Sequence, residues 1–172
     1  MSIKAPDSPK LNLPDDVRVA IVAARFNAEI VNALLEGCLK RLRAEGIQGN
    51  RIDVHRVPGA FELPVTAAAL ARTRQFSAVI CLGCVVRGDT PHFDYVAGEA
   101  ARGIMDVAVA EGLPIIFGVL TTNTEQQAWD RTGGSHGHSG ERAAEAAMEM
   151  ISVLATIKTN AERASLTDPT NG

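Results

Sequence analysis

Short apolar runs alternate along this chain with longer segments in which apolar residues recur every three or four positions. The runs predict four buried strands, at residues 17–24, 52–57, 78–86 and 114–120. The periodic segments predict helices, at residues 28–45, 62–73, 93–111, 124–131 and 141–157. Because strands alternate with helices and are apolar on both faces, we predict an α/β fold of three layers, with helices flanking a four-stranded parallel sheet.

The remaining segments set the expected domain boundaries. A chain of 172 residues fits one domain, which we place at residues 17–158. We expect residues 1–16, which hold three prolines, to form a flexible arm, and the polar residues 159–172 to form a disordered tail. The glycine- and histidine-rich residues 133–140 predict a flexible polar loop before the last helix.

Charge and hydropathy exclude several classes of protein. The formal net charge of −3 gives no general attraction to nucleic acid or to an anionic membrane. No apolar stretch approaches the roughly 18 residues of a membrane-spanning helix. The first sixteen residues lack the apolar segment of a signal peptide. We therefore expect a cytoplasmic protein that binds neither nucleic acid nor membranes.

Three cysteines, Cys38, Cys81 and Cys84, form no regular disulfide framework. Cys81 and Cys84 have the C-x-x-C spacing, but they lie inside the apolar run 78–86. A redox-active pair normally opens a helix, where the dipole lowers the pKa of the thiol. We therefore interpret both cysteines as small buried residues of a strand.

Polar and aromatic residues follow the predicted strands, and the carboxyl ends of parallel strands meet at one edge of a sheet. The segments concerned are residues 25–27, 58–62, 87–95 and 121–123. Phe26 and Phe61 lie at strand ends, where an aromatic ring can stack on a flat heterocycle; core packing is the alternative for Phe61. Glu62 either stabilises the start of a helix or binds a polar group of a ligand.

The segment after the third strand carries the most chemistry. Gly88, Asp89 and Thr90 lead into a helix, whose free N–H groups can hold a phosphate; the alternative is a helix cap made by Asp89 or Thr90. His92 falls in the first turn of that helix, where it acts either as a general base or as a hydrogen-bonding partner of the loop.

Further along the chain, Arg131 suits a phosphate, because a guanidinium binds phosphate oxygens in pairs; a solvated charge at a helix end is the alternative. His136 and His138 lack the third ligand of a zinc site, so we predict no metal.

Four ordered segments, at residues 24–27, 58–64, 86–96 and 117–122, resemble the lumazine synthase family. The resemblance covers residues 17–157. It implies a flavodoxin-like fold, no metal or organic cofactor, and a homopentamer that in some members assembles further into an icosahedral shell. It also implies the condensation of 5-amino-6-(D-ribitylamino)uracil with 3,4-dihydroxy-2-butanone 4-phosphate, which are small-molecule substrates.

The resemblance also implies roles for individual residues. His92 matches the acid/base, and Asp89, Thr90 and Arg131 match the phosphate site. The aminouracil site would comprise Phe26, Asn27, Ala60, Phe61, Glu62, Cys84, Val85, Val86 and, from the adjacent subunit, Phe117. Ser135 and Ser139 stand in a stretch where many members carry lysines, so a lysine role there is not expected in this chain.

Two other classes of function compete with the enzyme. A non-catalytic flavin or lumazine carrier would keep Phe26 and Phe61 but would need neither His92 nor Arg131. A flavodoxin-like redox protein would need a phosphate-binding loop directly after the first strand, and Arg25-Phe26-Asn27 is not such a loop. The presence of His92 and Arg131 favours the enzyme.

Overall fold

A four-stranded parallel sheet forms the middle of the computed structural model, which describes residues 11–166. The strands are β1 (Val19–Ala24), β2 (Ile52–Val57), β3 (Ala78–Val86) and β4 (Ile115–Thr122). Their order across the sheet is β2-β1-β3-β4, and each neighbouring pair is parallel. This order matches the first four strands of the flavodoxin-like arrangement.

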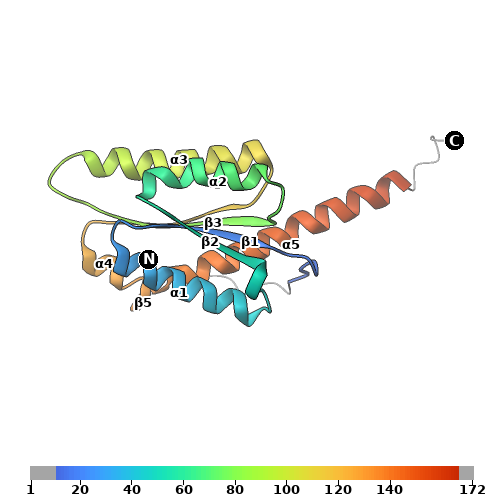
Figure 1. Ribbon diagram of the computed structural model, residues 1–172, viewed down its shortest axis with the longest axis horizontal. Helices are drawn as coiled ribbons and strands as arrows, with labels where there is room; N and C mark the ends of the chain where they lie inside the picture. The colour runs from blue at the N-terminus through green and yellow to red at the C-terminus, as the bar shows by residue number, and fades with distance from the viewer. Residues whose placement is uncertain (1–10, 167–172) are drawn as a thin grey trace.

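Helices cover both faces of the sheet, which confirms the predicted three-layer α/β fold (Figure 1). One face carries α2 (Leu63–Arg72) and α3 (His92–Glu111). The other carries α1 (Ala28–Ala44), α4 (Glu125–Trp129) and α5 (Ser139–Leu166). Two short 3-10 helices, Gly49–Arg51 and Ala60–Glu62, precede β2 and α2.

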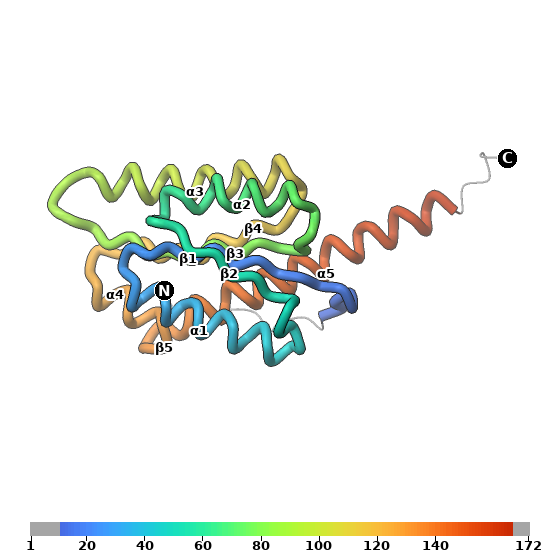
Figure 2. Tube along the Cα trace, viewed as in Figure 1, coloured from blue at the N-terminus to red at the C-terminus, as the bar shows by residue number. Residues whose placement is uncertain are grey.

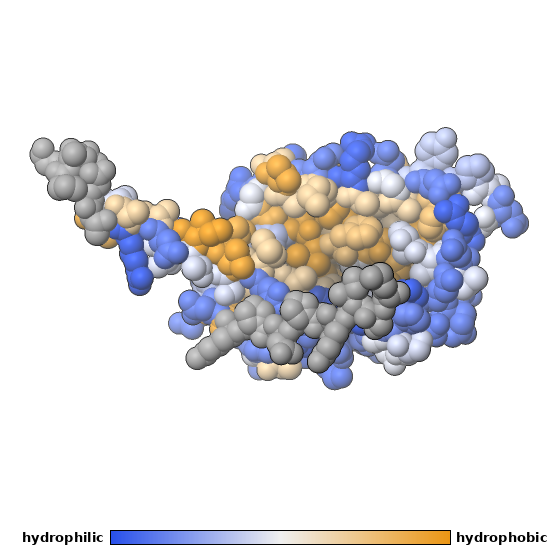
Figure 3. All heavy atoms as spheres, turned by 180° about the vertical axis from the view of Figure 1, so that it is seen from behind, coloured by the Kyte–Doolittle hydropathy of each residue, from blue (hydrophilic) through white to orange (hydrophobic). Residues whose placement is uncertain are grey.

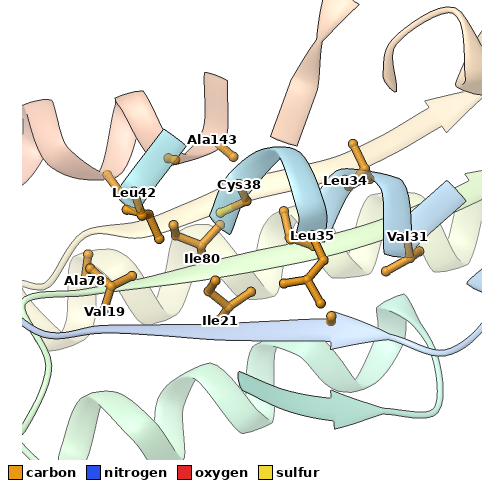
Figure 4. Packing of buried hydrophobic residues seen from close by; sticks show 14 of the residues in the cluster. Val19, Ile21, Val31, Leu34, Leu35, Cys38, Leu42, Ala78, Ile80 and Ala143 are labelled. Atoms are coloured by element: carbon orange, nitrogen blue, oxygen red, sulfur yellow. The ribbon is translucent and has the colours of Figure 1, made fainter. Parts of the chain in front are cut away.

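The two central strands are buried along nearly their whole length because their side chains are apolar on both faces. Val19 and Ile21 point into the core on the α1 and α5 side, whereas Ala20 and Val22 point into the core under α2 and α3. Figure 4 shows the first of these cores, where Leu34, Leu42 and their neighbours meet Ile21 and Ile80. Each fully buried leucine or isoleucine contributes roughly 1.5–3 kcal/mol to folding.

Residues 133–140 do not form the flexible loop that the sequence predicts. They contribute to a small antiparallel hairpin of β5 (Thr132–Gly134) and β6 (Gly137–His138). The His138 ring lies against Gly37 of α1, where an added Cβ would come within 2.1 Å of the ring. His138 Nδ1 also accepts a hydrogen bond from the N–H of Gly140 at 3.2 Å. The hairpin is thus held by a packing partner about a hundred residues away, which a local pattern does not show.

The described parts of both terminal segments, residues 11–16 and 159–166, are more ordered than the sequence predicts. Helix α5 continues to Leu166, so the expected disordered tail is wrong for residues 159–166; alanine, glutamate and arginine there favour a helix. At the other end, Leu11 and Leu13 of the expected arm pack against the core, and Asn12 N–H donates to Ser152 Oγ at 3.1 Å. Residues 1–10 and 167–172 lie outside the described range. No helix within residues 11–166 has the length and apolar content of a membrane span.

We predict that Gly140→Ala destabilises the protein, because an added Cβ would lie 2.0 Å from the carbonyl oxygen of Leu34. Overpacking of this kind costs about 1–3 kcal/mol, measured as the free energy of unfolding in denaturant. Gly98→Ala is the matched control, because Gly98 is also helical but has open space around it. That control should gain about 0.5–1 kcal/mol. Equal stability of the two variants would contradict the close approach of α1 and α5.

Candidate active site

From β1 the chain continues to β2 on one side of the sheet, and from β3 it continues to β4 on the other side. A cavity opens at the carboxyl ends of β1 and β3, where these connections diverge. The chain leaves β1 toward α1 on one face and leaves β3 toward α3 on the other (Figure 2). Such a divergence is where open α/β sheets bind ligands. The cavity has a volume of about 380 Å³ and is lined by Phe26, Asn27, Gly59, Ala60, Phe61, Cys84, Val85, Val86, Gly88, Thr90, His92, Phe93 and Val96.

The turn after β1 is built around Asn27, whose backbone is left-handed with φ of 54°. Asparagine tolerates this conformation better than most residues. Its side-chain Nδ2 donates a hydrogen bond to the carbonyl oxygen of Cys84 at 2.9 Å, which ties the end of β1 to the end of β3. The N–H of Phe26 bonds to the carbonyl of Pro58 at 3.1 Å. In the single chain, Phe26 is 72% exposed, so its ring is free to stack on a ligand.

A 3-10 turn follows β2 and presents Phe61 to the cavity. Glu62 Oε2 accepts a hydrogen bond from the N–H of Gly59 at 2.9 Å, and the Glu62 N–H bonds back to the Gly59 carbonyl at 3.3 Å. Glu62 therefore stabilises the turn, and its side chain is not part of the cavity lining. Phe61 is 57% exposed, so core packing is wrong for this residue.

Cys84, Val85 and Val86 at the end of β3 give the cavity an apolar wall. Burial, with a smaller contribution from the Glu125 carboxylate, raises the pKa of the Cys84 thiol to about 11. Burial also raises the pKa of Cys38 and of Cys81 to about 12. All three cysteines are free and buried, which confirms that the C-x-x-C spacing marks a strand. A protonated Cys84 offers a neutral surface and no thiolate nucleophile.

The loop between β3 and α3 supplies the polar side of the cavity. Thr90 and His92 line it, whereas Asp89 is exposed and lies outside the lining. No side chain makes a capping hydrogen bond at the start of α3, so the helix-cap alternative for Asp89 and Thr90 is wrong. The first turn of a 20-residue helix thus presents its positive end beside the cavity.

Phe117 and Arg131 are not brought to this cavity. Phe117 lies in the middle of the edge strand β4, opposite Cys81, and is 44% exposed. Arg131 follows α4 and donates from Nη1 to the carbonyl of Gln127 at 2.6 Å. Neither residue is among those that line the cavity of its own chain.

Sequence comparison identifies the protein family. The family described as 6,7-dimethyl-8-ribityllumazine synthase matches residues 16–155. The chain belongs to this family. It is 47% identical to the 6,7-dimethyl-8-ribityllumazine synthase of Protochlamydia amoebophila (strain UWE25) over 142 residues, which is 83% of this chain and 82% of the relative.

Membership of the lumazine synthase family establishes the reaction class. The chain is a transferase of riboflavin biosynthesis that condenses 5-amino-6-(D-ribitylamino)uracil with 3,4-dihydroxy-2-butanone 4-phosphate to give 6,7-dimethyl-8-ribityllumazine. Within residues 11–166, no group of three or more His, Cys, Asp or Glu side chains is arranged to hold a metal ion.

Three residues of the cavity were given no role from the sequence: Gly59, Phe93 and Val96. Gly59 belongs to a strand-end segment that the sequence singles out, but glycine offers no side chain to suggest a role. Phe93 and Val96 lie one and four residues after His92. The spacing of Phe93 and Val96 puts them on one side of α3, and this signal was available in the sequence.

We predict that Cys84 reacts slowly with a thiol reagent such as 5,5′-dithiobis(2-nitrobenzoate), although it lines the cavity. With a pKa of about 11, only roughly 10⁻³ of the thiol is ionised at about pH 8. Labelling should be slow in the native protein and should reach three thiols per chain after denaturation. Rapid native labelling that is lost in Cys84→Ala would contradict the raised pKa of Cys84.

Proposed function

We propose that the cavity at the ends of β1 and β3 is the aminouracil site of this lumazine synthase. Its support is a single arrangement: one cavity joins the exposed Phe26 ring with Thr90 and His92. In this proposal Phe26 stacks on the pyrimidine, and Asn27, Ala60 and Phe61 flank the ribityl chain. Cys84, Val85 and Val86 form the apolar wall. Glu62 contributes indirectly, because its hydrogen bond stabilises the turn that carries Phe61.

The phosphate of the ketone would bind where α3 begins. The positive end of this helix and the Thr90 hydroxyl provide donors for an anion. Asp89 carries a negative charge that would repel a phosphate, and its exposed position outside the cavity lining favours a backbone contribution only. Arg131 supplies the cationic partner, from an adjacent chain.

The chemistry then needs orientation and proton transfer. The 5-amino group of the uracil attacks the ketone carbonyl, and loss of water gives an imine. Phosphate leaves by elimination, and the ribitylamino nitrogen closes the ring with loss of a second water. Phosphate is a good leaving group, so no covalent nucleophile is required. His92 moves protons between these steps as the general acid and base.

We also propose that the active sites are shared between chains of a cytoplasmic homopentamer. Phe117 and Arg131 lie on the β4 side of the molecule, away from the cavity of their own chain. Exposed apolar residues of α3, β4 and α5 include Met105, Val109, Phe117, Met150 and Val153. A broad apolar area is visible on the face opposite to Figure 1 (Figure 3), and large apolar areas of this kind typically mark interfaces.

A closed ring follows if this apolar side meets the cavity edge of the next chain, because a head-to-tail contact generates cyclic symmetry. Phe117 and Arg131 would then enter the neighbour's site. Five chains of 18.2 kDa have a mass of 91 kDa, which light scattering measures directly. A much larger mass would indicate further assembly into an icosahedral shell, and an active monomer would exclude the shared site.

We predict that His92→Ala lowers the rate of lumazine formation roughly 10²- to 10⁴-fold while aminouracil binding is retained. Mixing the protein with both substrates and following lumazine fluorescence measures turnover. Fluorescence titration with the aminouracil alone measures binding. Unchanged turnover would remove His92 from the mechanism. Binding of lumazine without any turnover by the wild type would favour the carrier instead.

We predict that Arg131→Ala raises the KM of the ketone more than that of the aminouracil, because the guanidinium contacts only the phosphate. Free phosphate should compete with the ketone in the wild type and less so in the variant. An equal effect on both substrates would contradict this role.

The origin of Arg131 in a neighbouring chain is tested by mixing two impaired variants. Arg131→Ala chains keep His92, and His92→Ala chains keep Arg131. At a ketone concentration below the raised KM of Arg131→Ala, random reassembly of equal amounts of the two should restore about a quarter of the wild-type activity, because that fraction of interfaces joins an intact His92 to an intact Arg131. No recovery, with co-purification through an affinity tag on one variant showing mixed rings, would indicate that each site lies within one chain.

A further inference from the structure

Arg87 is the first residue after β3, and its side chain connects the end of β3 with two other segments next to the active site. Its guanidinium carbon lies 4.1 Å from the centre of the Phe93 ring. Its Nε donates to Asn123 Oδ1 at 3.2 Å, and Nη2 donates to an Asp94 carboxylate oxygen at 2.9 Å. The backbone N–H of Arg87 bonds to the Thr122 carbonyl at 2.8 Å. One planar side chain thus contacts the first turn of α3 and the segment after β4.

These contacts are the main side-chain attachment of the loop that carries His92. Within the described chain, no side chain of residues 88–92 forms a hydrogen bond or an ion pair with another residue. Phe93 and Asp94 directly follow His92 and both contact Arg87. The Phe93 ring also lines the cavity. Arg87 therefore holds the wall residue and the turn that together set where the His92 imidazole lies.

The exposure of the Arg87–Asp94 ion pair indicates that it positions the start of α3 more than it stabilises the fold. The side chains of Arg87 and Asp94 are 43% and 60% exposed, and ion pairs this open to water add little to the stability of the fold. Arginine suits the arrangement because its planar fork can stack on a ring and donate sideways to two acceptors at once. Lysine offers a single point charge on a flexible stem and cannot do both.

We propose that Arg87 is a positioning residue that acts on the reaction through His92. This inference rests on the proposed acid/base role of His92. Arg87 touches no substrate: it fixes the first turn of α3 against the ends of β3 and β4, so that the imidazole is already placed when both substrates are bound. The predicted effect falls on kcat, with aminouracil and ketone binding left to the residues that line the cavity.

The first experiment compares Arg87→Ala, Arg87→Lys and Arg102→Ala. Arg102 is the matched control, because it also lies near α3 acids, pairing with Glu99 and Asp106, but bridges no second segment. Arg87→Ala should lower kcat on the order of 10-fold with both KM values within about twofold, because small misplacements of a catalytic group slow turnover strongly. Arg87→Lys should recover only part of the loss, and Arg102→Ala should match the wild type. A rise in the KM of the ketone at unchanged kcat would overturn the proposal and make Arg87 a phosphate ligand.

The second experiment is a double-mutant cycle with His92→Ala. If Arg87 acts through His92, Arg87→Ala should change kcat by less than about twofold once the imidazole is absent. The same 10-fold loss in both backgrounds would overturn the proposal. If His92→Ala loses kcat as predicted while the kcat of Arg87→Ala is unchanged, this inference alone is overturned. If the kcat of His92→Ala is unchanged, the proposed function is overturned. If Arg87→Ala fails to assemble, Asp94→Asn, which removes the charge pair, should show the same dependence on His92.

Discussion

The side-by-side, parallel arrangement of β1 and β3 is the constraint on which the rest of the molecule depends. The two strands are buried by helices on both faces, and their chains leave the sheet in opposite directions. A gap at their carboxyl ends is the geometric result. The hydrogen bond from Asn27 Nδ2 to the Cys84 carbonyl joins the two sides of this gap. A rigid core thereby fixes the position of loops that have few contacts of their own.

The buried core and the exposed residues of the cavity contribute differently to the free energy of folding. Burial of apolar side chains on the two faces of the sheet supplies most of the folding energy, whereas the rings of Phe26 and Phe61 remain in water and add little to it. Large aromatic rings at a strand end therefore favour ligand binding over folding. His92, the proposed acid/base, is also exposed, and the Arg87–Asp94 ion pair that we propose positions it contributes little to stability.

The sequence predicted the parts of this structure that follow from local patterns. The apolar runs located all four strands, and the strand-end residues Phe26, Thr90 and His92 do line one cavity. The order of the strands is not a local property, so the sequence pattern did not reveal that β4 is an edge strand whose Phe117 lies outside the lining of the cavity. The hairpin at 132–138 depends on the contact of His138 with Gly37, a tertiary interaction that no window of sequence contains.

The length of α5 has a practical consequence for labelling the enzyme. Its 28 residues span about 42 Å at the rise of an α-helix, and the helix extends well past the body of the domain. The loop between β3 and α3 lies at the opposite end of the molecule in Figure 1. A fluorophore or a fused domain attached after Leu166 would therefore sit far from the cavity of its own chain, on a stiff helical spacer, and could report on the mutual distances of chains in an assembly without entering their chemistry.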